Sequence, residues 1–232
     1  MRYLALLLLL VAGPAPGEEL IRVAVAANFR SSLAQINDQF QRETGHRIVL
    51  SSGSTGVLYS QITHGAPFDL FFAADRESTV KLQTNKLGSK PFCYARGPLV
   101  LAGGNGELSQ LADPELSLAI ANPVTAPYGV AAAEVLARAE FSPGQARKLV
   151  RGTNVVQAYQ FWRSGATDLA LLPKALAPGA TAVPDEWYQP LEQYAIVLRS
   201  KAPKPVIDAY LNWIRSDTVR ALITDAGYQP CP

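Results

Sequence analysis

The fold is indicated first by residues 21–50, which read IRVAVAANFRSSLAQINDQFQRETGHRIVL. The apolar run over 21–26 predicts a strand, and residues 48–50 predict another. Between them, apolar residues recur at helical spacing over 30–44, and Gly45 then ends the segment, as expected of a helix. The succession of strand, helix and strand is typical of an α/β protein.

The same alternation continues to the end of the chain. Further strands are predicted at 70–73, 98–102, 118–121, 169–172 and 194–198. Further helices are predicted at 56–64, 77–84, 128–139, 155–164, 205–216 and 218–226. We therefore expect an α/β fold with mainly parallel sheets flanked by helices.

No internal repeat and no flexible linker marks a domain boundary, so the boundary must come from the order of elements. Segments 93–98 and 191–200 are the expected crossings between two lobes. Lobe 1 would then contain residues 18–97 and 199–232, and lobe 2 would contain residues 98–198.

The N-terminus has the order of a secretory signal peptide. Arg2 gives a positive end, Leu4 to Ala12 is wholly apolar, and small residues follow before Glu18. The apolar run is shorter than the ~20 residues that a membrane-spanning helix needs. The alternative is a short buried helix. We expect a cleavable signal peptide over residues 1–17, and no cysteine follows it to carry a lipid anchor.

The overall charge is small. Removal of residues 1–17 deletes one arginine and no acid, so the formal charge falls from +2 to +1. Such a chain has no general field that would attract nucleic acid or a membrane surface. Any specificity for an anion must therefore come from local groups.

The two cysteines, Cys93 and Cys231, are candidates for one disulfide, because an exported chain with an even number of cysteines folds under oxidising conditions. The bridge would tie the C-terminus to the middle of the chain. The alternative is two free thiols.

No catalytic residues are predicted. The two histidines, His46 and His64, fall in segments typical of exposed loops. The sequence has no nucleophile elbow, phosphate-binding loop, dinucleotide fingerprint or zinc-type histidine spacing. Paired carboxylates from distant loops stay possible. Asp69 and Asp75 are expected to be structural, at the ends of a strand and a helix.

Four turns that follow predicted strands are small, polar and uncharged: 26–28, 52–56, 127–129 and 153–155. In an open α/β sheet, ligands bind beyond the carboxyl ends of the strands. Most of these turns come directly before a helix, whose free amides and positive dipole end form an anion site. Each turn alone is more often a simple helix cap. Together they predict an anion site.

The absence of charge in these turns favours a fully deprotonated dianion, which needs hydrogen-bond donors on every oxygen. A protonated anion such as phosphate would favour a carboxylate acceptor. An organic carboxylate would favour a bidentate arginine, and Arg30 and Arg151 lie near two of the turns. We interpret both arginines as solvated.

The chain resembles the molybdate-binding proteins of ABC transporters over essentially its whole mature length. The resemblance rests on 25–29, 51–62, 65–75, 121–123, 127–129, 153–155 and 226–228. The block Gly65-Ala66-Pro67-Phe68-Asp69-Leu70-Phe71, with the trailing Ala74-Asp75, is its most specific element. The resemblance implies a two-lobed periplasmic binding fold of type II that closes over molybdate or tungstate.

The resemblance also implies the ligand contacts, partners and location. Contacts around the molybdenum, held as an oxyanion and not ligated directly, would come from Asn28, Thr55, Tyr128 and Val155. Ala27 and Ser54 complete the candidate ligand-binding set. No cofactor is implied, and the partner would be the membrane permease of an ABC transporter. A periplasmic monomer is expected.

The sequence departs from the family pattern at three positions. Many members have serine at the positions of Asn28 and Thr55, and some have a ligand-facing tyrosine where Pro173 stands. Proline offers no N–H, so Tyr128 is a candidate replacement donor. Four alternatives stay open at this point: a binding protein for sulfate or an organic anion, a ferric-ion binder, an exported enzyme, and a sensor that reports to a membrane kinase.

Overall fold

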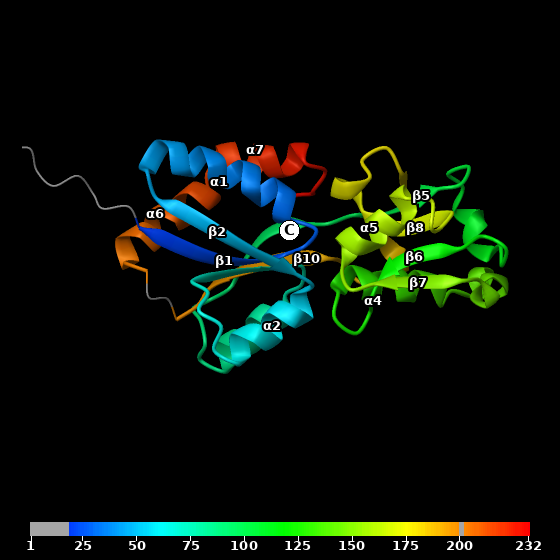
Figure 1. Ribbon diagram of the computed structural model, residues 1–232, viewed down its shortest axis with the longest axis horizontal. Coiled ribbons are helices and arrows are strands. Elements are labelled where there is room, and N and C mark those ends of the chain that lie inside the picture. Colours follow the sequence, from blue (N-terminus) through cyan, green and yellow to red (C-terminus); the bar gives the residue numbers. More distant parts are fainter. Residues whose placement is uncertain (1–18, 200–201) are drawn as a thin grey trace, which may run out of the picture.

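The computed structural model describes residues 19–199 and 202–232, which form two lobes side by side (Figure 1). Each lobe is built on one five-stranded sheet flanked by helices. This confirms the expected two-lobed α/β fold. The predicted signal peptide over residues 1–17 lies outside the described residues. Within the described ranges, no helix is long and apolar enough to cross a membrane.

The first sheet has the strand order β2-β1-β3-β10-β4. Its strands are β1 (Leu20–Ala26), β2 (Arg47–Gly53), β3 (Leu70–Ala73), β4 (Phe92–Arg96) and β10 (Glu192–Val197). Strand β1 is parallel to β2 and β3, whereas β10 is antiparallel to both β3 and β4. One strand therefore runs against the other four.

Both faces of this sheet are covered because side chains alternate along buried strands. Val23 and Val25 point to the face covered by α1 (Arg30–Thr44), α6 (Lys204–Ile214) and α7 (Asp217–Asp225). Ala24 points to the opposite face, which is covered by α2 (Thr55–Thr63) and α3 (Glu77–Thr84). Figure 1 shows these two helical layers above and below the sheet.

The second sheet repeats this arrangement with the order β7-β6-β8-β5-β9. Its strands are β5 (Leu99–Gly103), β6 (Leu118–Ala121), β7 (Leu149–Gly152), β8 (Leu169–Pro173) and β9 (Thr181–Ala182). Here β5 runs against the rest. Helices α4 (Pro127–Leu136) and α5 (Val155–Arg163) pack on opposite faces. Short 3-10 helices occupy Leu108–Ala112, Ala139–Ala146, Lys174–Leu176 and Asp185–Trp187.

The chain crosses between the sheets twice. It leaves β4 for β5 through Gly97–Pro98, as expected, and returns between β9 and β10 over residues 183–191. The expectation that lobe 2 runs to residue 198 is wrong for β10, because this strand pairs with β3 and β4 of the first sheet. We therefore assign residues 98–191 to lobe 2 and the flanking residues to lobe 1.

The predicted disulfide between Cys93 and Cys231 is present, with Cα atoms 6.1 Å apart across a sequence separation of 138. Beside it, Arg96 and Gln229 exchange two backbone hydrogen bonds, each with an N···O distance of 2.8 Å. The last residues are therefore fastened along the edge strand β4, next to the first crossing.

We expect the double variant Cys93→Ser/Cys231→Ser to fold but to be less stable. Chain entropy gives a loss of up to about 4–5 kcal/mol in the free energy of unfolding for a loop of this length. Urea denaturation of the variant and of oxidised wild type measures the difference. Wild type in excess reductant serves as the control. Equal denaturation midpoints for all three samples would show that the bridge does not stabilise the fold.

Candidate functional site

Each of the four predicted turns lies at the start of a helix that follows a strand, and residues 127–129 form the first turn of α4 itself. Helices α1, α2, α4 and α5 begin at Arg30, Thr55, Pro127 and Val155. The two lobes meet beside these helix starts. The amide of Gly56 in lobe 1 donates to the carbonyl of Thr125 in lobe 2, with an N···O distance of 2.9 Å. The positive ends of helices from both lobes therefore lie along one interlobe cleft.

The structure buries all six predicted ligand-binding residues, each no more than 6% exposed. They are Ala27, Asn28, Ser54, Thr55, Tyr128 and Val155. Ala27 of lobe 1 belongs to the same apolar cluster as Tyr128 and Val155 of lobe 2. The cleft is thus closed, and polar groups in it are shielded from bulk water.

Several hydrogen-bond donors in this cleft have unused capacity. The Ser54 hydroxyl is buried and has no hydrogen-bond partner among the described residues. The Thr55 Oγ1 atom accepts from the Ala74 amide at 3.0 Å, which leaves its own proton available. The backbone N–H groups of Asn28 and Val155 also have no acceptor among residues 19–199 and 202–232. Buried donors left unpaired are costly, so this arrangement requires an acceptor.

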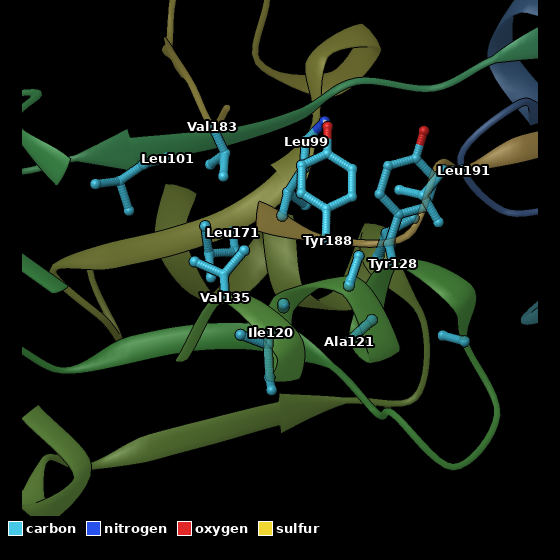
Figure 2. Packing of buried hydrophobic residues seen from close by; sticks show 14 of the residues in the cluster. Leu99, Leu101, Ile120, Ala121, Tyr128, Val135, Leu171, Val183, Tyr188 and Leu191 are labelled. Carbon is cyan, nitrogen blue, oxygen red and sulfur yellow. The ribbon is translucent and has the colours of Figure 1, made fainter. Parts of the chain in front are cut away.

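Tyr128 adds a phenolic hydroxyl from lobe 2. Its ring lies in an apolar cluster beside Tyr188 and Leu191 (Figure 2). Its Oη atom accepts a hydrogen bond from Gln193 Nε2 at 3.1 Å. Burial raises the pKa of Tyr128 well above its ordinary value, so the hydroxyl keeps its proton at neutral pH. The group can therefore donate to a ligand.

The Asn28 side chain is occupied by protein contacts. Its Nδ2 atom donates to Gln193 Oε1 at 2.8 Å and to Tyr228 Oη at 3.2 Å. Tyr94 also donates to Gln193 Oε1, at 2.9 Å. The group that Asn28 can offer to a ligand is thus its backbone N–H.

Sequence reasoning missed the central partner, Gln193, as well as Tyr94. Gln193 is fully buried at a register shift between β10 and β4. An uncharged polar residue within a strand-forming run was the available signal, and it is weak. Tyr228 was noticed only as part of the family resemblance, without a role.

Gly97, at the first crossing, permits the close approach of these groups. A Cβ atom at this position would lie 1.8 Å from Tyr128 Oη and 2.3 Å from Gln193 Nε2. Such distances are far below any real contact, so a side chain here would displace Tyr128 or Gln193.

Among the charged residues considered from the sequence, Asp75 lines a pocket between the lobes together with Gly56 and Thr125. Arg30 and Arg151 are exposed. Asp69 accepts a hydrogen bond from the Arg22 amide at 2.7 Å, and Asp75 accepts one from the Ser78 amide at 2.8 Å. Both carboxylates thus hold local backbone, as expected.

The remaining candidates add no donor or metal ligand to the cleft. Pro173 is buried at the end of β8, opposite Leu99. His64 is exposed, and its Nδ1 atom contacts its own helix at Ser60. His46 is half-buried beside Phe40. Over residues 19–199 and 202–232, no cluster of three or more His, Cys, Asp or Glu side chains could hold a metal ion.

Comparison with known proteins agrees with this geometry. The family model for bacterial extracellular solute-binding proteins matches residues 21–229. The molybdate-binding protein ModA of Azotobacter vinelandii is 35% identical over 226 residues, covering 90% of this chain and 89% of the relative. ModA of Rhodobacter capsulatus is 32% identical, covering 93% and 90% of the two chains.

Solved structures give the same result. The periplasmic molybdate-binding protein of Azotobacter vinelandii superimposes with a TM-score of 0.84 at 34% identity, covering 91% of this chain and all of that one. The sulfate-binding protein SubI of Mycobacterium tuberculosis has a TM-score of 0.73 at 15% identity, which shows a shared fold alone. The chain therefore belongs to the bacterial extracellular solute-binding proteins and, among these, to the molybdate-binding protein family.

Proposed function

We propose that this protein binds molybdate or tungstate as a dianion in the interlobe cleft and delivers it to the membrane permease of an ABC transporter. One observation carries the proposal. Uncharged donors from both lobes lie in a buried cleft, and one of them, the Ser54 hydroxyl, has no partner among the described residues. A ligand that only accepts hydrogen bonds would satisfy them.

Neutral donors suit an oxyanion that carries no proton. The candidate donors are the hydroxyls of Ser54, Thr55 and Tyr128 and the amides of Asn28 and Val155. Each of the last two amides lies at the start of a helix, where the dipole favours negative charge. We propose these five residues, with Ala27 in van der Waals contact, as the binding site.

Binding would be coupled to closure of the lobes. Ser54 and Asn28 belong to lobe 1, whereas Tyr128 and Val155 belong to lobe 2, so a ligand that touches both sets favours the closed state. The permease would then recognise the closed form. We further propose that residues 1–17 export the protein to the periplasm, where it acts as a monomeric carrier without catalytic activity.

Sulfate is the second candidate ligand, because the same donors would accept any tetrahedral dianion of similar size. An organic carboxylate is less favoured, since it would be held by a bidentate arginine and both Arg30 and Arg151 are exposed. The difference between molybdate and sulfate then rests on the size of the closed cleft.

We expect isothermal titration of the protein without residues 1–17 to show tight binding of molybdate and tungstate. Sulfate and phosphate should bind far more weakly, and phosphate is further disfavoured because no carboxylate is among the proposed ligand contacts to accept its proton. Circular dichroism on the same sample controls for folding. Silence toward all four anions from a folded sample would refute the proposed function.

We expect Tyr128→Phe to weaken molybdate binding while leaving the fold intact. Loss of one hydrogen bond to a charged ligand costs about 1.5–3 kcal/mol, or roughly 10- to 100-fold in Kd. Tyr188→Phe, in the same apolar cluster, is the matched control, because the Tyr188 hydroxyl contacts Asp185 and the Leu99 amide instead. Unchanged affinity in Tyr128→Phe would remove Tyr128 from the site.

We expect Gly97→Ala to weaken molybdate binding at least as strongly as Tyr128→Phe, because the added Cβ atom displaces the Tyr128 hydroxyl. Titration calorimetry measures the loss, and the thermal midpoint without ligand reports on the fold. Gly179→Ala is the matched control, since nothing lies within 4 Å of a Cβ atom there. Equal affinities for Gly97→Ala and wild type would contradict the closed geometry.

A further inference from the structure

Four buried side chains connect the C-terminal tail to the ligand site by consecutive hydrogen bonds. They are Tyr228, Asn28, Gln193 and Tyr128, and we call them the amide relay. We infer that Gln193 is a positioning residue, which transmits the hydrogen-bond direction set by Tyr228 and Asn28 to Tyr128, so that the Tyr128 hydroxyl can only donate toward the ligand. This inference rests on the proposed function and explains how the site selects an anion without a proton.

The direction of the relay, meaning which group of each hydrogen-bonded pair donates, is set at Tyr228. The Tyr228 hydroxyl lies 2.8 Å from the backbone carbonyl of Asn28, which can only accept, so the single phenolic proton points there. The same hydroxyl lies 3.2 Å from the terminal group of the Asn28 side chain. With its proton used, the Tyr228 oxygen must accept from that group, which is therefore the Nδ2 amide and not the Oδ1 oxygen.

The orientation of the Asn28 side chain then determines the orientation of the Gln193 side-chain amide. Because Asn28 presents Nδ2 as a donor, the Gln193 atom 2.8 Å away must be the acceptor Oε1. Tyr94 does not decide the orientation of Gln193, because its single proton can point to Gln193 Oε1 at 2.9 Å or to the Ala73 carbonyl at 3.1 Å. The opposite end of the Gln193 amide, Nε2, must then face Tyr128.

The orientation of Gln193 limits where the hydroxyl proton of Tyr128 can point. Gln193 Nε2 donates to Tyr128 Oη at 3.1 Å, so the Tyr128 proton cannot point back along this bond. It points elsewhere in the cleft, where the candidate ligand donors lie. A ligand oxygen that accepts is favoured there, whereas a ligand O–H would meet a second donor and leave both groups unpaired. Gln193 thereby contributes to selectivity without contacting the ligand.

The relay also spans the two lobes. Gln193 is fully buried on β10 of lobe 1, whereas Tyr128 belongs to α4 of lobe 2. The bond between them crosses the interface between the lobes. The direction imposed within lobe 1 by Tyr228 and Asn28 is therefore transmitted to Tyr128 in lobe 2.

A double-mutant cycle tests the inference. Gln193→Met keeps the side-chain length but removes the amide, and we expect molybdate Kd to rise roughly tenfold, the effect of one typical buried hydrogen bond. Tyr228→Phe should give a loss of similar size. In the Tyr128→Phe background, both substitutions should change Kd by less than about twofold, because the hydroxyl that they orient is gone.

Two outcomes would overturn the inference. One is wild-type affinity in Gln193→Met, and the other is an equal loss with and without the Tyr128 hydroxyl, which indicates a merely structural role. If wild type binds a different oxyanion, the cycle is run with that anion.

A ligand-independent measurement separates failure of the relay from failure of the proposed function. Hydrogen exchange of the Asn28 side-chain amide, followed by ¹⁵N NMR without ligand, should be slow in wild type and faster in Tyr228→Phe. Equal exchange rates would contradict the relay even if wild type binds molybdate. Protected exchange in a protein that binds no oxyanion would support the first part of the relay and refute the function.

Discussion

The structure depends on the cost of burying polar groups where the two lobes meet. Asn28, Gln193 and Tyr128 are almost fully inaccessible to solvent, and each would destabilise the closed state without a partner. Their mutual hydrogen bonds remove that cost among themselves. The Ser54 hydroxyl lacks such a partner, and this imbalance gives the cleft its demand for an acceptor.

Neutral groups can bind an anion at a lower burial cost than charged side chains. A buried arginine or lysine would attract many anions and would be costly to leave buried without one. Hydroxyls and helix N-termini offer directed partial charges without that penalty. Burial raises the pKa values of Tyr128 and Tyr228, which keeps both phenols protonated as donors over the physiological pH range. In the closed cleft, these two hydroxyls therefore stay neutral.

The sequence predicted local elements well where periodicity was strong. The helices at 30–44 and 77–84 and the strands at 70–73 and 118–121 have their expected bounds. Short strands at 92–96, 149–152 and 181–182 were missed because few residues define them. The assignment of β10 to a lobe was wrong because strand pairing is a long-range property. The turns identified the helix starts, yet Gln193 could not be recognised, since its partners come from positions 28, 94 and 128.

The tail fastened by Cys93–Cys231 has a consequence for the ligand site. Tyr228 lies three residues before Cys231, whose disulfide to Cys93 joins this segment to β4. Until it docks against Asn28, the relay has no defined direction. Formation of the bridge would therefore favour docking of Tyr228 against Asn28 and, with it, a defined direction of the relay.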